Sequence, residues 1–192
     1  MRTGMIRSGL ATLMLTAALL AVPPAEAQRL GSSPLSPAPA GVPVQTIIEC
    51  GSGYVSHELY DAKITLLEIV RGAKAWDLLK EATAANEPLK AGFEYILARI
   101  RFEYSARGLP GDCGHELKGE QFIAVSPEGK VYKAPSVTPP NPRLSGMLRS
   151  GDVLEGWVAF SVPREDSKTL MTFAVKAGGA VEHGGNAWFQ LY

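Results

Sequence analysis

Residues 93–104, FEYILARIRFEY, alternate between apolar and charged side chains. The apolar members share one face and the charged members share the other, namely Ile96, Ala98, Ile100, Phe102 and Tyr104 against Arg99, Arg101 and Glu103. Because successive side chains of a β-strand point to opposite faces, this period of two predicts a strand that is buried on one side.

Two neighbouring stretches show the same period. Residues 153–162, VLEGWVAFSV, alternate until Pro163, which ends the run because proline has no N–H to donate. Residues 62–70, AKITLLEIV, alternate up to Leu66-Leu67, where two successive apolar residues predict a bulge or burial on both faces. Shorter strands fit 121–126, 130–132, 169–175 and 187–192, with a turn at 126–130. Seven or more short strands predict an all-β fold, an antiparallel β-sandwich of about seven to nine strands.

One segment has a helical rather than a strand pattern. Residues 73–82, AKAWDLLKEA, are rich in helix formers, and Trp76, Leu79 and Ala82 recur every three residues. The sequence therefore predicts one short helix inserted between two strands.

The first 27 residues read as an export signal. Arg2 and Arg7 precede an uncharged apolar run, and Ala25-Glu26-Ala27 is an A-x-A cleavage site, so the mature chain is expected to begin at Gln28. The apolar run is shorter than the roughly 20 residues that span a bilayer, and we expect no transmembrane segment in the mature chain. The protein is predicted to be exported, either to a periplasm or to the outside of the cell.

Three regions follow from these patterns: a signal peptide at 1–27, a flexible linker at 28–43 and a sandwich domain at 44–192. The linker prediction rests on a Pro-, Ser-, Gly- and Ala-rich composition without periodicity. The mature chain has 17 basic and 18 acidic residues, and they are interspersed. Nucleic-acid binding is therefore not expected, because it needs a basic stripe.

The chain has two cysteines, Cys50 and Cys113. In an oxidising compartment they are expected to form a disulfide, which would close a loop of about 63 residues and stabilise the fold by roughly 4 kcal/mol. Two alternatives stay open: a pair of free thiols, or a soft-metal site, which the neighbouring Cys113-Gly114-His115 would suit.

No catalytic or cofactor-binding motif is found, so we expect neither an enzyme nor a cofactor. Each histidine, His57, His115 and His183, stands next to a glutamate in an expected loop. If these loops met at one end of the sandwich, the three histidines could form a zinc or copper site. The alternative is that they are ordinary polar loop residues.

Three stretches carry a resemblance to a known group: 69–76 with 86–97, 122–132, and 150–163. The last resembles the pattern G-x-x-x-x-G-aromatic-V-x-F-x-V-P. Together they are similar to the immunoglobulin-like (telokin-like) secreted bacterial domains of unknown function, a group that includes a mycobacterial secreted immunogenic antigen. The resemblance covers about residues 60–175. It implies an immunoglobulin-like sandwich and no assigned reaction, and no catalytic residues carry over.

The function expected from sequence is non-catalytic binding or scaffolding in the cell envelope or the extracellular space, with an unknown protein or envelope component as partner. A strand edge or the loops at one end would provide the contact surface. The alternative is an extracytoplasmic metal-binding protein. Trp157, Trp188 and Tyr192 could form an exposed contact or pack against the sheet, and the sequence leaves both open.

Overall fold

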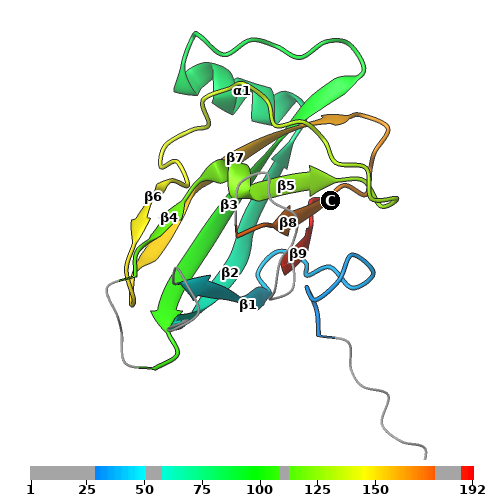
Figure 1. The fold of residues 1–192 in the computed structure, drawn as a ribbon. Helices are drawn as coiled ribbons and strands as arrows, with labels where there is room; N and C mark the ends of the chain where they lie inside the picture. Colours follow the sequence, from blue (N-terminus) through cyan, green and yellow to red (C-terminus); the bar gives the residue numbers. More distant parts are fainter. Residues whose placement is uncertain (1–28, 51–57, 109–112, 176–186) are drawn as a thin grey trace, which may run out of the picture.

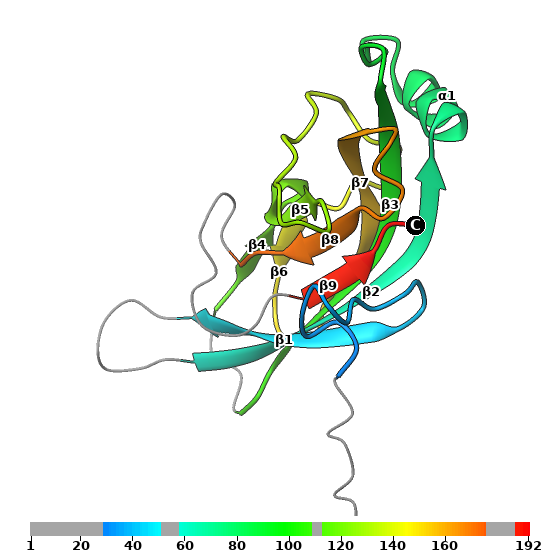
Figure 2. The same cartoon turned by 90° about the vertical axis from the view of Figure 1, so that its right-hand side faces the viewer.

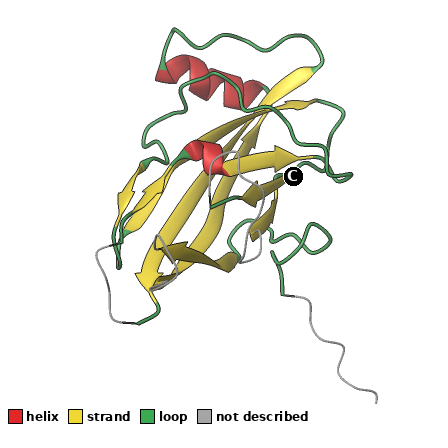
Figure 3. Cartoon of the chain, viewed as in Figure 1, coloured by secondary structure: helices red, strands yellow, loops and turns green. Residues whose placement is uncertain are grey.

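The computed structural model describes residues 29–50, 58–108, 113–175 and 187–192. These ranges contain nine strands, one α-helix and one 3-10 helix (Figure 3). In chain order the elements are β1 (Pro43–Cys50), β2 (Glu58–Arg71), α1 (Ala73–Ala82), β3 (Phe93–Ala106), β4 (His115–Leu117), η1 (Gly119–Gln121), β5 (Phe122–Val125), β6 (Gly146–Leu148), β7 (Val153–Pro163), β8 (Leu170–Phe173) and β9 (Ala187–Gln190).

The strands form two main sheets and a short ribbon. One sheet has the order β1-β2-β3-β7, the other has the order β5-β8-β9, and β4 pairs with β6. All pairs between named strands are antiparallel. The smaller sheet lies across one face of the four-stranded sheet, as Figures 1 and 2 show from two directions. The predicted all-β antiparallel sandwich with one inserted helix is confirmed.

The strand periodicity places the core as predicted. The apolar face of β3 is buried between the sheets, and every one of its five members is at most 1% exposed. The bulge expected at Leu66-Leu67 is present, because the β2–β3 register shifts between Leu66 and Glu68. The strand expected at 130–132 is only an isolated bridge from Val131 to Val125. The turn at Gly129 (φ 89°) does form, but the chain leaves the sheet after Tyr132.

The helix α1 covers the outer face of the four-stranded sheet near one end (Figure 2). Ala75 and Leu79 are fully buried against Tyr95 and Leu97 of β3. Trp76 is half-buried and stacks on Tyr95, with ring centroids 6.0 Å apart. This outer-face apolar cluster explains why β3 is buried on both sides at its N-terminal end.

The segment before β1 differs from the flexible linker predicted for 28–43. Ala38 is fully buried and forms a parallel bridge with Phe189 of β9. Its N–H donates to the Trp188 carbonyl at 2.8 Å, and its carbonyl accepts from the Gln190 N–H at 2.9 Å. The N–H and C=O groups on the outer edge of a strand need hydrogen-bond partners, and an extended Pro-rich segment can provide such partners. The segment needs no alternating pattern to do so, which is why its sequence does not reveal the pairing. The part of this segment around Ala38 therefore packs against β9, whereas the sequence predicted a flexible linker there.

No helix in the described ranges is long and apolar enough to cross a membrane.

Candidate functional site

The two cysteines are joined. Cys50, the last residue of β1, forms a disulfide with Cys113, and their Cα atoms lie 6.3 Å apart. The predicted bridge is confirmed, and the free-thiol alternative is wrong. The bridge ties the end of the four-stranded sheet to the residues just before β4.

His115 lies in strand β4 rather than in a loop, which corrects the loop prediction for this residue. Its half-buried ring stacks on Phe102, with centroids 6.1 Å apart, and lies 5.7 Å from the Tyr104 ring. Burial lowers the pKa of His115, with the nearby Glu116 opposing the shift. Its Nε2 atom lies 3.4 Å from Nε2 of Gln121. The ring is therefore a packed, mainly neutral group near pH 7.

The other two histidines of the predicted metal site, His57 and His183, lie outside the described residues, as does the Gly-rich passage 178–185. Within the described ranges, no group of three or more His, Cys, Asp or Glu side chains could hold a metal ion. Gln121, beside His115, donates from its amide to the carbonyl of Val175, the last residue described before 187. The convergence of the three histidines stays a prediction.

An aromatic stack fills the core next to His115. The rings of Tyr60 and Tyr104 are nearly parallel, with an interplanar angle of 8° and centroids 4.7 Å apart. The Tyr60 hydroxyl donates to Glu58 at 2.8 Å, whereas the buried Tyr104 hydroxyl has no hydrogen-bond partner among the described residues. Burial, together with Tyr60 and Glu58, raises the pKa of Tyr104 to about 12. The positions of these rings on the core face follow from the strand period, but their mutual stacking does not.

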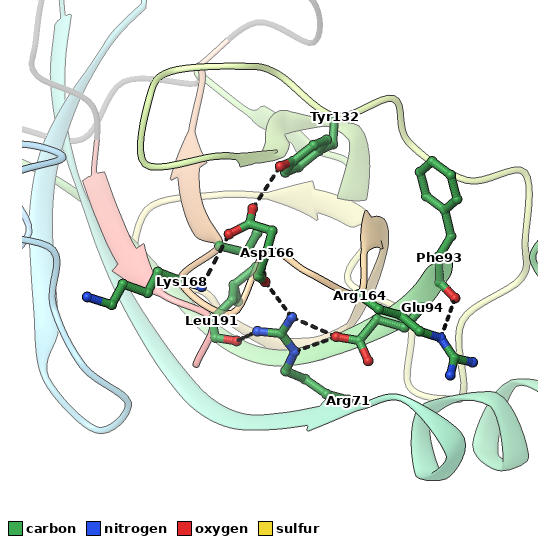
Figure 4. A network of polar contacts seen from close by, with 9 residues as sticks. Arg71, Phe93, Glu94, Tyr132, Arg164, Asp166, Lys168 and Leu191 are labelled. Atoms are coloured by element: carbon green, nitrogen blue, oxygen red, sulfur yellow. Dashed lines mark hydrogen bonds and ion pairs between the residues drawn. The ribbon is translucent and has the colours of Figure 1, made fainter. Parts of the chain in front are cut away.

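Arg71 is the centre of a polar network that sequence reasoning missed (Figure 4). Its Nε and Nη2 atoms donate to one oxygen of Glu94 at 2.9 and 2.6 Å. Two backbone carbonyls complete the set, those of Leu191 at 3.1 Å and Asp166 at 2.9 Å. Four donated bonds use most of the guanidinium, so this arginine fastens the C-terminal segment and the β7–β8 connection to β2.

Asp166 extends the same network. It accepts a hydrogen bond from the Tyr132 hydroxyl at 2.8 Å, and Figure 4 shows the two side chains pointing toward each other. Burial and this carboxylate raise the pKa of Tyr132 to about 12. The network is a structural clasp in which each charged group has a partner.

A cleft of about 250 Å³, partly open to solvent, lies beside β7. We call residues 133–145, which connect β5 to β6, the strap, and this hollow the strap cleft. Its walls come from the strap, from η1 and β5, and from β7: Gly119, Glu120, Phe122, Ala134, Pro135, Val137, Thr138, Pro139, Arg143, Leu144, Ser145, Trp157, Val158 and Ala159.

Asn86, just beyond α1, holds the strap at its middle. Its amide donates to the Thr138 carbonyl at 2.9 Å and to the Leu79 carbonyl at 2.7 Å, and its oxygen accepts from the Thr138 N–H at 2.8 Å. The NH2 group and the oxygen of the buried Asn86 side chain are therefore both hydrogen-bonded. The strap is therefore pinned over the outer face of β7 rather than loose.

Gly156 allows the backbone of the strap to lie in direct contact with β7. A Cβ atom at this position would lie 2.5 Å from the Arg143 carbonyl carbon and 2.7 Å from its oxygen. At the crossing, the Trp157 N–H donates to Pro142 at 2.9 Å and the Leu144 N–H donates to Trp157 at 3.3 Å. A bulkier residue would separate the two chains, so this glycine decides where the strap cleft closes.

The strap cleft carries two charged side chains, from Arg143 and Glu120, and both residues are exposed. Among the described residues, neither side chain forms an ion pair or a hydrogen bond. A second hollow, of about 190 Å³ on the outer face of the large sheet, differs in this respect. There Lys63 and Glu103 pair at 3.1 Å, and Lys63 lowers the pKa of Glu103. Of these two hollows, the strap cleft therefore has the charges that remain available to a ligand.

No protein-family model matches the chain, and no curated protein matches it. A crystal structure of a "putative lipoprotein (ycdA)" from Bacillus subtilis subsp. subtilis str. 168 is similar at 8% identity with a TM-score of 0.46, over 67% of this chain and 35% of that one. The yjhA protein from Bacillus subtilis is similar at 9% identity with a TM-score of 0.46, over 81% of this chain and 99% of that one. The chain thus spans about a third of the length of ycdA.

Proposed function

We propose that this chain is an exported, non-catalytic binding or scaffolding domain of the bacterial cell envelope or extracellular space, in the manner of the secreted immunoglobulin-like domains that it resembles. Two features support export: the leader pattern of residues 1–27 and the Cys50–Cys113 disulfide, which suits an oxidising compartment.

The strap cleft is the observation that carries the binding role. It combines an aromatic wall at Trp157, apolar strap residues and two charged side chains without partners among the described residues. Binding sites are typically concave and mostly apolar, with a few polar groups that orient the ligand. The polar clasp around Arg71, by contrast, is occupied in holding the fold.

Site-specific photo-crosslinking tests this function. The protein is expressed with its own leader, and the mass of the form recovered outside the cytoplasm should equal that of residues 28–192. A benzoylphenylalanine at exposed Ala134, in the strap cleft, is compared with one at exposed Lys74 on α1. Irradiation with envelope fractions and culture medium should yield a discrete adduct at position 134 only, and excess unlabelled protein should remove it. Identical adducts at both positions, or none at 134, would contradict a binding role for the cleft.

A metal-binding role at the disulfide end is the second candidate. It is supported by the position of His115 near Val175 and near the disulfide, because these residues adjoin the chain segments that contain His183 and His57. Thermal unfolding with zinc, copper or calcium would show a native-state ligand as a rise of a few degrees in Tm. A rise that disappears in His115→Ala would favour this candidate, and no rise with any of the three metals would remove it.

A further inference from the structure

Along β7, the backbone N–H and C=O groups of successive residues point alternately toward β3 and away from it. Trp157 directs both its N–H and its C=O away from β3, toward Pro142 and Leu144 of the strap. In an antiparallel ladder this direction alternates from one residue to the next, and the β3–β7 register runs without a shift from Val153 to Pro163. Ala159 and Ser161 therefore turn their N–H and C=O groups to the same outer side as Trp157.

Ala159 and Ser161 thus extend the outer edge of β7 beyond Trp157, the residue that pairs with the strap. Among the described residues, no backbone or side-chain hydrogen-bond partner is found for the outward N–H and C=O groups of Ala159 and Ser161. The outer edges of the smaller sheet differ, because β9 is paired by Ala38 and β5 by Tyr132. Unpaired strand edges are templates for another extended chain.

The strap cleft lies along this edge. Ala159 and Trp157 belong to its lining, and Arg143 pairs in register with Trp157. Two residues of a strand span about 7 Å, which is within the reach of an arginine side chain. An extended chain on the Ala159 edge would thus have an aromatic ring and an uncompensated guanidinium beside it.

We propose that the strap cleft binds a short extended segment of a partner protein, with backbone pairing at Ala159 and an acidic side chain of that segment on Arg143. This deepens the proposed function and rests on it. A peptide is the ligand class that offers alternating N–H and C=O groups at strand spacing, and such strand addition is a common mode of recognition. A carboxylate matches the arginine because the guanidinium donates in a fixed planar fork.

Selection from a peptide library tests the acidic contact. The probe is a library of hexapeptides with randomised sequences, acetylated and amidated at the ends so that only side chains supply carboxylates. Peptides retained by the immobilised protein should be enriched in Asp and Glu. Arg143→Gln should weaken binding of the selected peptides about tenfold. Arg149→Gln, which removes an exposed charge outside the cleft lining, serves as the matched control and should leave binding unchanged.

Amide hydrogen exchange tests the backbone pairing separately. Saturation with a selected peptide should slow exchange at Ala159, and much less at Val158, whose N–H faces β3. Three results would overturn the inference: no acidic enrichment, equal loss of binding in the two arginine variants, or unchanged exchange at Ala159. If one of these occurs while the Ala134 crosslink still forms, the binding function stands and only the peptide mode fails.

Discussion

Substituting Gly156 by alanine should separate the strap from β7. The added Cβ would meet backbone atoms of Arg143 at 2.5 and 2.7 Å, and the nitrogen of Leu144 closer still. Ordinary carbon contacts lie near 3.5–4.0 Å, so the chains must move apart by about 1 Å. Backbone cannot rotate away as a flexible side chain can, which makes the clash expensive.

The expected loss follows from the contacts at the crossing. Two hydrogen bonds, Trp157 to Pro142 and Leu144 to Trp157, are each worth about 0.5–1.5 kcal/mol. Forced displacement of packed backbone adds about 1–3 kcal/mol, and the lower entropy of the unfolded alanine chain returns about 0.4–1 kcal/mol. The free energy of unfolding should therefore fall by roughly 1–5 kcal/mol, which at an m-value of about 2 kcal/mol/M lowers the urea midpoint by about 0.5–2.5 M.

Urea denaturation of the oxidised protein measures this loss. Gly146→Ala is the matched control, because its Cβ would lie 3.7 and 3.9 Å from Leu154 methyl groups, at ordinary contact distance. That variant should stay within about 0.5 kcal/mol of the wild type. The reasoning about the crossing is refuted if Gly156→Ala is as stable as Gly146→Ala.

Three further outcomes are expected. Arg71→Met should lower the free energy of unfolding by about 2–4 kcal/mol, because it leaves the largely buried carboxylate of Glu94 without its partner. Arg99→Met breaks the exposed pair with Glu68, whose atoms lie 3.7 Å apart, and should cost under about 0.5 kcal/mol. Urea denaturation curves of the two variants measure the difference. Reducing the Cys50–Cys113 bridge should cost about 4 kcal/mol at a separation of 63 residues, and equal urea midpoints with and without reductant would contradict this. Burial lowers the pKa of His115 below 6.5, so the unfolded chain binds more protons just below that pH; stability should fall as the pH drops from 7.5 to 5.5, and the Tm of a His115→Gln variant should fall less over the same range.

The strands could be predicted from the sequence because the alternation of apolar and polar residues is a local property of the chain. Whether a side chain of β3 or β7 points to the core depends only on its place in an alternating series, and the helix at 73–82 is recognisable from its own composition. The bulge at Leu66-Leu67 could be predicted for the same reason. The disulfide was predicted as well, since two cysteines allow a single intramolecular pairing, but the sequence left free thiols and a soft-metal site open.

The candidate site could not be read in this way. Arg143, Glu120 and Trp157 come from the strap, from η1 and from β7, and no local pattern links them. The assignment of His115 to a loop was wrong, since β4 is three residues long and its pairing with β6 depends on residues about 30 positions away. The signal peptide and the convergence of His57 and His183 stay predictions.

The sequence by itself determined the faces of the strands and the inserted helix, because each depends on neighbours along the chain. It favoured the Cys50–Cys113 disulfide, but the structure decided it. Only the tertiary structure decided that Gly31 and Ala38 pair with the β9 edge, that the strap meets β7 at Gly156 and Trp157, and that Ala159 lines the cleft. These features depend on which edges the folded sheets expose and on which distant segments fill them, and such contacts exist only once the two sheets have packed together.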